Sequence, residues 1–156
     1  MPDDVRWLTD KERVAWLALA DLMLRLPAAL DAQLLRDSGI TLYDYFVLSN
    51  LSMHPERTMR LSELARITSS SLSRLSNVVK RLEQRGLLRR EPDPDNGRYT
   101  NAILTGAGWD LVVAAAPAHV GAVRDYVIDG LTDEQIETLR SVACHVTERV
   151  RENGAC

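Results

Sequence analysis

The feature that most constrains this fold is a short amphipathic pattern with a helix-start signal before it and a helix-stop signal after it. Its apolar residues recur at steps of three and four: Leu72, Leu75, Val79 and Leu82. This period predicts a helix with one buried face. The hydroxyl residues 68–71 suit its N-cap, and Gly86 is well placed just beyond its C-terminal end.

Short elements are predicted on both sides of this helix. Residues 61–67 favour a short helix before it, and residues 87–91 and 98–104 favour two strands after it. The Pro/Asp/Asn/Gly-rich segment between the strands, 92–97, predicts a turn. Because an isolated hairpin is only marginally stable, this one must lean on the helices. The order of elements is that of a winged helix-turn-helix.

A long helix is predicted at the N-terminal end, from Thr9 or Asp10 to about Arg36, ended by the pair at 38–39. It has two apolar sides: Trp16, Leu19, Met23, Leu26, Leu30 and Leu34 on one, and Val14, Leu17, Leu24 and Ala28 on the other. A helix of this kind must be covered on two sides, by the rest of its chain and by a partner subunit. Pro27 should kink or break it.

Three more helices complete the expected fold. Thr41 and Asp44 form a variant capping box for one that runs to about Met53. Thr105 caps another, which Pro117 should bend, and a capping box at 132–135 opens the last. The expected buried positions are Trp109, Val112, Val113, Ala116, Val120, Val123 and Val127 on the former, and Ile136, Leu139, Ala143, Val146 and Val150 on the latter. The predicted fold class is mainly α with a small β-hairpin wing (α+β).

Charge is distributed unevenly along the chain. The formal net charge is −3, yet residues 57–98 hold ten Lys/Arg against five Asp/Glu, and the remainder holds nine against seventeen. A basic middle between acidic ends is typical of a protein that offers one face to phosphates. Chance clustering is the alternative interpretation of the charge pattern alone.

The polar side of the amphipathic helix supports DNA binding. It carries short hydroxyls at its N-terminal end, then Arg and Asn, then further bases: Ser70, Ser71, Ser73, Arg74, Asn77, Lys80 and Arg81. Arg can bind guanine and Asn can bind adenine with two hydrogen bonds each, and the N-terminal end of a recognition helix reaches base edges. Lys80 and Arg81 suit backbone phosphates. The plainer alternative is a solvated helix face with caps.

The hairpin adds a second DNA-binding signal. Arg98 near its tip suits the narrow minor groove, where the negative potential is strongest. Alternatively, Arg98 pairs with Asp93 or Asp95 at the turn, and both interpretations can hold together.

The segment LSELARITSSSLSRLSNVVKRLEQRGLLRREPDPDNGRYTNAILTGAGW resembles the winged-helix core of the MarR family of regulators. The resemblance extends to DYFVLSNLS upstream and AAAPAHVGAVRDYVIDGLT downstream, and so covers essentially the whole chain. It implies a homodimer built from the terminal helices, with recognition helices in successive major grooves of a pseudo-palindrome and wings in the minor grooves. The implied parts are a dimerisation helix (1–36), a winged helix-turn-helix domain (37–104) and C-terminal dimerisation helices (105–156).

The resemblance also assigns DNA-contacting positions. The base-reading stretch corresponds to Ser70, Ser71, Ser73, Arg74 and Asn77, with Ser69 in the preceding turn, and the wing arginine corresponds to Arg98. The family commonly has Asp-x-Arg at the wing tip, whereas this chain has Asn96-Gly97-Arg98. Asn96 can accept a hydrogen bond but offers no charge, so the arginine is expected to be held more loosely unless Asp95 substitutes.

Family members often respond to small aromatic or phenolic ligands. The residues offered as lining for such a ligand are Trp16, Met23, Tyr45, His54 and Trp109, each of which also suits plain core or surface. His119 could be sensitive to pH, although a structural role beside Pro117 is favoured. A thiol switch is disfavoured, because the first helix has no Cys, Cys144 is expected to act as a small hydrophobe and Cys156 is at the chain end.

Other functions have less support. The three histidines, His54, His119 and His145, lie in no catalytic motif, and there is no phosphate-binding loop. The two cysteines form no metal-ligand pattern, so neither a metal nor a cofactor is expected. The N-terminus lacks the features of a signal peptide, and the stretch 14–30 is too polar for a membrane span, so the cytoplasm is expected. The remaining rival is a winged helix used for protein contacts.

Overall fold

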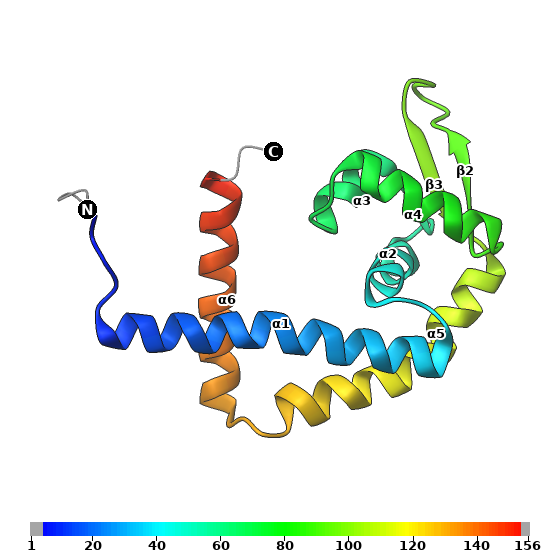
Figure 1. Ribbon diagram of the computed structural model, residues 1–156. Helices are drawn as coiled ribbons and strands as arrows, with labels where there is room; N and C mark the ends of the chain where they lie inside the picture. The colour runs from blue at the N-terminus through cyan, green and yellow to red at the C-terminus, as the bar shows by residue number, and fades with distance from the viewer. Residues whose placement is uncertain (1–4, 154–156) are drawn as a thin grey trace. The chain divides into compact units, whose positions relative to one another are not determined.

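The computed structural model describes residues 5–153 and divides the chain into two compact units, 1–119 and 120–156. The first unit contains the winged helix (Figure 1). Its elements are α1 (Asp10–Ser38), α2 (Leu42–Met53), β1 (Thr58–Arg60), α3 (Leu61–Ile67), α4 (Leu72–Gln84), β2 (Leu88–Pro92), β3 (Thr100–Leu104) and most of α5 (Gly106–Val123). This confirms a mainly helical α+β fold.

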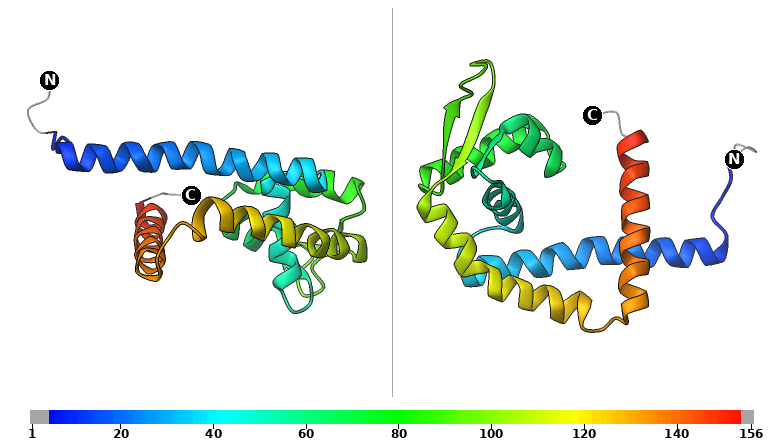
Figure 2. Two further views of the ribbon diagram at one scale, coloured as in Figure 1. Left: turned by 90° about the horizontal axis from the view of Figure 1, so that it is seen from below. Right: turned by 180° about the vertical axis from the view of Figure 1, so that it is seen from behind.

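Helix α1 begins and ends where the sequence predicts. Thr9 and Glu12 form a capping box at its start, and Gly39 ends it in the left-handed conformation with φ of 64°. The helix continues through Pro27, so the expected break is wrong. Only its C-terminal part is buried, at Leu30, Gln33 and Leu34, while its N-terminal part runs out beyond the other elements of the first unit (Figure 2).

Helix α2 lies at the centre of the core. Its capping box of Thr41 and Asp44 is confirmed, and Val47, Leu48 and Leu51 are fully buried. Apolar residues from α1, α3, α4, the strands and α5 surround it in one hydrophobic cluster. The cluster sets α3 and α4 in a helix-turn-helix arrangement, and Gly86, with φ of 71°, ends the turn after α4.

The sheet has three strands, one more than predicted. Its order is β1-β3-β2, with both pairs antiparallel. The missed strand, β1, is only three residues long and its middle residue, Met59, is buried in the core. It pairs with β3 through residues 58–60, which gives the hairpin of β2 and β3 a third strand to lean on. The hairpin tip projects from the helices (Figures 1 and 2).

The start of α5 is held against the turn that follows α4. The Thr105 hydroxyl donates to the Gly86 carbonyl at 2.6 Å, and accepts from the Gly108 N–H at 3.1 Å. Gly108 packs so closely that a Cβ there would lie 2.0 Å from the Leu87 carbonyl oxygen. The expected stripe of α5 is shifted: Val112 is buried as predicted, but Ala115, His119 and Ala122 are buried while Val113 and Val120 are exposed. The helix runs unbroken through Pro117.

The second unit holds the end of α5, a π-helical turn (Arg124–Ile128) and α6 (Asp133–Asn153). The capping box at Thr132 and Gln135 is confirmed by two hydrogen bonds. The π-helical turn was not predicted. The expectation that α6 buries a stripe is wrong for the isolated chain, because none of its side chains is buried among the residues that the structure describes. Cys144 is likewise exposed rather than buried, and Cys156 lies outside the described residues.

One segment, Gly106–Ile128, is long and apolar enough to cross a membrane by length and composition, with a mean hydropathy of 1.3. That test is weak, because a core helix of a soluble protein also passes it. Only 17% of its 18-residue apolar window is buried within the chain. Most of that window therefore lacks cover from the chain itself.

Candidate nucleic-acid interface

Helix α4 buries four of its apolar residues on one face and exposes its polar residues on the other. Leu75, Val78, Val79 and Leu82 are buried, whereas Leu72, predicted to join them, is 52% exposed. The opposite face presents the predicted DNA-contacting side chains to solvent: Ser71, Ser73, Arg74, Asn77, Lys80 and Arg81. Ser70 is half-buried and Ser69 is exposed in the turn.

The serines build the N-terminal end of α4. Ser71 is its N-cap and accepts a hydrogen bond from the Arg74 N–H at 3.2 Å. The Ser73 hydroxyl lies 3.3 Å from that of Ser71. Ser69 has φ of 51°, a left-handed conformation that tightens the turn before the helix. The first turn of α4 has no acidic residue, so its positive dipole end is open to a phosphate or a base.

A buried carboxylate fixes α4 against α2. Asp44 is almost fully buried, and it accepts hydrogen bonds from the Thr41 N–H at 3.1 Å and from the Arg81 guanidinium. Arg81 remains about half exposed on its other side. This residue, expected only at phosphates, therefore also sets the position of the recognition helix on the core.

Arg74 lies beside a tyrosine from α2. Its guanidinium carbon is 5.0 Å from the centroid of the Tyr43 ring. The Tyr43 hydroxyl lies 3.0 Å from the Thr68 hydroxyl in the turn before α4. Tyr43 therefore contacts both the turn and the recognition helix, a role that the sequence analysis missed.

The wing is organised around Asp93, which is only 6% exposed. Its carboxylate accepts hydrogen bonds from Arg60 Nε at 2.6 Å and from the N–H groups of Asp95 and Asn96 at 2.9 and 3.2 Å. The Arg60 guanidinium also covers the Tyr99 ring, 4.7 Å from its centroid. The hydrogen bond from Arg60 holds the pKa of the Asp93 carboxyl below its ordinary value.

Arg98 leaves the wing as an exposed side chain. Among residues 5–153 it forms no ion pair, and the Asp93 carboxylate is bound by Arg60 instead. The alternative pairing with Asp93 or Asp95 is therefore wrong. Asn96 accepts a hydrogen bond from the Arg98 backbone N–H at 3.1 Å, so it shapes the backbone under Arg98 and leaves the guanidinium unengaged.

The positive charges of this region divide into two groups. Ion pairs engage Arg60, Arg81, Arg89 and Arg90. Within the described part of the chain, the other basic residues on or near the recognition helix and wing form no ion pair: Arg66, Arg74, Lys80, Arg85 and Arg98. The second group supplies the free positive charge that a phosphate backbone attracts.

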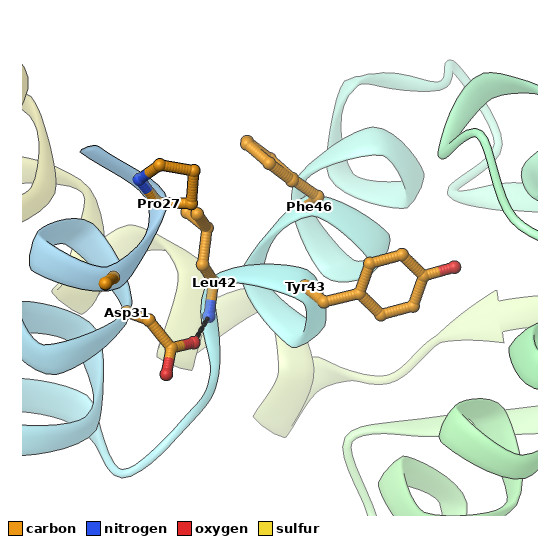
Figure 3. Close-up of a pocket in the computed structure, with 6 residues that line it drawn as sticks. Pro27, Asp31, Leu42, Tyr43 and Phe46 are labelled. Carbon is orange, nitrogen blue, oxygen red and sulfur yellow. Dashed lines mark hydrogen bonds between the residues drawn. The ribbon is translucent and has the colours of Figure 1, made fainter. Parts of the chain in front are cut away.

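The five residues proposed as ligand lining are not brought together. Trp16 and Met23 are exposed on α1, Tyr45 is buried, and His54 is half-buried at the end of α2. The Trp109 ring lies under the Arg57 guanidinium, whose central carbon is 3.8 Å from the ring centroid. A shallow, mainly apolar groove of about 360 Å³ lies instead between α1 and α2, lined by Pro27, Ala28, Asp31, Leu42, Tyr43 and Phe46 (Figure 3).

His119 is buried where three helices of the first unit meet. Its ring lies 4.5 Å from that of Tyr45, and its Nδ1 lies 3.4 Å from Gln33 Oε1. The amide nitrogen of Gln33 donates to Asp37 at 2.9 Å, which leaves its oxygen to accept from His119. Burial lowers the pKa of His119. The favoured structural role agrees with this position.

Known proteins share this architecture along the whole chain. The sequence model of the MarR family matches residues 38–98. The MarR family transcriptional regulator Sco3205 from Streptomyces coelicolor, solved in complex with DNA, is 38% identical with a TM-score of 0.92, over 98% of this chain and 94% of that one. The chain belongs to the MarR family. A second MarR family regulator from Streptomyces coelicolor, AbsC, is 36% identical with a TM-score of 0.91, over 96% of this chain and all of AbsC.

More distant structures show the MarR fold alone. CouR from Rhodococcus jostii RHA1, bound to p-coumaroyl-CoA, is 22% identical with a TM-score of 0.75, over 91% of this chain and 95% of that one. A comparison with curated proteins found no match. Membership of the MarR family confirms the resemblance inferred from the sequence and makes this chain a transcriptional regulator.

The contacts by which Tyr43, Arg60 and Asp93 shape the MarR interface were missed by the sequence analysis, which named Asp93 only as an alternative partner of Arg98. Tyr43 contacts Thr68, 25 positions away, and Arg60 binds Asp93, 33 positions away, and no local period reports such contacts. An indirect signal existed for Asp93, since an Asp at the start of a turn often accepts backbone N–H groups. Tyr43 and Arg60 gave no signal that local pattern analysis could use.

Proposed function

We propose that this MarR family protein is a homodimeric repressor that binds a pseudo-palindromic operator and is released by a small aromatic ligand. The observation that carries the proposal is the exposed face of α4, with its serines, Arg74 and Asn77, next to a wing arginine whose charge is unengaged. The buried face of α4 packs into the hydrophobic core, which sets the position of the helix and of its exposed face.

In this proposal α4 enters the major groove. Ser70, Ser71, Ser73, Arg74 and Asn77 meet base edges, while Ser69, Lys80 and Arg81 meet the phosphate backbone. Asn96 shapes the wing, and Arg98 enters the adjacent minor groove. The 38% identical Streptomyces coelicolor regulator in complex with DNA supports DNA as the partner.

The dimer is supported by apolar surface that the chain leaves uncovered. Exposed large hydrophobic side chains gather on three helices: Val14, Trp16, Leu17, Leu22, Met23 and Leu24 on α1, Val113 and Val120 on α5, and Leu139, Val142, Val146 and Val150 on α6. Large apolar side chains gathered on one helix mark an interaction surface, whereas scattered single ones are ordinary on a monomer. We therefore retain the division into a dimerisation helix (1–36), a DNA-binding domain (37–104) and C-terminal dimerisation helices (105–156).

The ligand is proposed to be small and aromatic. The apolar groove beside Tyr43 and Phe46 supports this proposal, since aromatic rings and few polar groups are typical of such sites. Trp16, Met23, Tyr45, His54 and Trp109 remain the lining predicted from the sequence, and a partner subunit would have to complete it.

A regulator of this family is proposed to act in the cytoplasm, without a cofactor and without enzymatic activity. The rival interpretation is a winged helix that binds proteins. The two differ in their response to salt, because DNA binding releases counterions and weakens steeply as salt rises. The decisive experiment selects bound sequences from random DNA. It then measures affinity for the selected site between 50 and 200 mM salt, a range in which about 10³- to 10⁵-fold is lost for 6–10 phosphate contacts. A flat salt response, or no enriched sequence, would favour the rival.

The first prediction concerns Arg74. Replacement by Ala should weaken binding to the selected site by about 1–3 kcal/mol and relax the preference at one base pair of each half-site. Binding titrations against the selected site and its single-base variants measure this. Equal loss on every sequence would make Arg74 a phosphate contact instead.

A further inference from the structure

Tyr43 belongs to α2 rather than to the recognition helix α4, yet it contacts Arg74 of that helix. Its backbone lies at the first turn of α2, and its ring extends away from Pro27 and Asp31 of α1 (Figure 3). Tyr43 is half-buried, and the guanidinium of Arg74 is one of the groups that lie against its ring.

The hydroxyl of Tyr43 has a fixed donor role. Thr68 Oγ1 donates its only proton to the Leu64 carbonyl at 2.7 Å. The 3.0 Å contact between the two hydroxyls must then use the Tyr43 proton, so Tyr43 donates and Thr68 accepts. This hydrogen bond ties the ring to the turn between α3 and α4.

The ring in turn supports the Arg74 guanidinium. A separation of 5.0 Å from guanidinium carbon to ring centroid is within the range of a cation–π interaction. Arg74 carries no ion pair within the described residues that would otherwise restrain its long side chain. Ordering such a side chain costs conformational entropy, and a ring that holds it before binding reduces that loss on DNA.

We propose that Tyr43 is a positioning residue for base recognition: anchored by Thr68, its ring holds Arg74 in the orientation that meets a base edge. The inference rests on the proposed role of Arg74 in DNA binding. Tyr43 acts through Arg74, and its removal therefore reduces discrimination between base pairs as well as affinity.

The test is a double-mutant cycle on the selected operator and on DNA changed at the base pair that Arg74→Ala relaxes. Tyr43→Leu removes ring and hydroxyl, Tyr43→Phe keeps the ring, and Met53→Ala removes an exposed apolar side chain of the same helix, outside the groove, as a control. Tyr43→Leu should lower operator affinity about 2- to 5-fold and reduce the ratio of the affinities for the two DNAs. Tyr43→Phe should keep most of that affinity ratio, and Met53→Ala should leave it unchanged.

Partial unfolding of the Tyr43→Leu variant can be distinguished from loss of the Arg74 orientation. A smaller folded fraction lowers apparent affinity for both DNAs equally and leaves their ratio intact, and circular dichroism reports it directly. Should Tyr43→Leu not fold, Tyr43→Met removes the ring in the same way. In the Arg74→Ala background, loss of the ring should have no further effect on the ratio or the affinity.

Three outcomes overturn the inference. If Tyr43→Leu weakens binding equally in the presence and absence of Arg74, Tyr43 contacts DNA itself. If Tyr43→Leu leaves both affinity and ratio unchanged while Arg74→Ala reduces them, the ring does not position the arginine and the proposed function stands. If Arg74→Ala has no effect on any DNA, the assigned role of Arg74 fails and takes the positioning inference with it.

Discussion

Asn96 illustrates how one residue sets the geometry of another in this protein. Its side chain accepts the Arg98 backbone N–H, while its own N–H donates to the buried Asp93 carboxylate. The sequence analysis expected a looser arginine at this position because Asn offers no charge. In the structure the backbone beneath Arg98 is held by two hydrogen bonds through Asn96, and it is the guanidinium that is left unengaged.

Arg98 should therefore matter most where the minor groove is narrow. We expect Arg98→Ala to weaken operator binding chiefly on DNA with A·T-rich flanks, where the groove potential is most negative. Titrations on two operators that differ only in their flanks measure this. Arg13→Ala, which removes the same charge from an exposed position on α1, serves as the control, and equal loss by Arg98→Ala on G·C-rich flanks would contradict minor-groove recognition.

His119 should make stability depend on pH. Because burial lowers its pKa in the folded chain, the unfolded chain takes up a proton first, from about pH 6.5 downward. The contribution of neutral His119 to the free energy of unfolding is thus complete above that pH. It declines as the pH falls toward the lowered pKa that His119 has in the folded chain.

Urea unfolding at pH 7.5 and 5.5 tests this. The free energy of unfolding should fall between the two, and His119→Gln should remove part of that fall. His145→Gln, at an exposed position on α6, should leave the fall as large as in the unsubstituted protein. If His119→Gln also leaves it unchanged, the dependence on pH arises elsewhere.

At the scale of elements, local signals predicted most boundaries and long-range contacts determined the rest. Capping boxes begin helices, and Gly39 and Gly86 follow their ends, through neighbours within four residues, so the sequence alone located these boundaries. Strand β1 exists because Met59 is buried and residues 58–60 pair with residues 101–103, 41 to 45 positions later. The tie between Arg60 and Asp93 likewise joins β1 to the wing and depends on that pairing.

The wing should lose its order when Asp93 is removed. Asp93→Ala deletes the acceptor of three hydrogen bonds, so trypsin should cut after Arg98 faster and operator affinity should fall. Asp95→Ala, whose carboxylate is exposed, is the matched control and should be cut at the original rate. In the unsubstituted protein, the lowered pKa keeps the Asp93 carboxylate charged at pH values below the usual pKa of Asp. The ordered wing should therefore persist there and be lost only as the pH falls through the lowered pKa of Asp93. Unchanged cutting of Asp93→Ala would contradict this account.

At the scale of the whole molecule, the chain contains one well-packed core and several incompletely covered helices. The sequence predicted which residues of α6 are apolar, and the resemblance assigned this helix to dimerisation. Periodicity alone identifies an apolar face without identifying what covers it, and no side chain of α6 is buried among the described residues. The same reason explains the scattered ligand lining, because residues such as Trp16 and Met23 lie on surface that this chain does not enclose.

The proposed dimer can be tested on α6. Leu139→Glu together with Val146→Glu places two charges on its apolar side, and should give a monomer by analytical ultracentrifugation that no longer retards operator DNA. Arg149→Glu, at an exposed polar position of the same helix, should remain dimeric. A doubly substituted protein that stays dimeric and still binds the operator would exclude α6 from the interface.

The uncovered helices also bear on how such a regulator would respond to its own abundance. If a second copy must cover them, each protein molecule gains stability only by meeting another, so mass action links folding, pairing and operator occupancy. Occupancy would then rise with about the square of the cellular protein level wherever monomers prevail. A modest change in synthesis or turnover would become a sharper change in transcription, without any ligand.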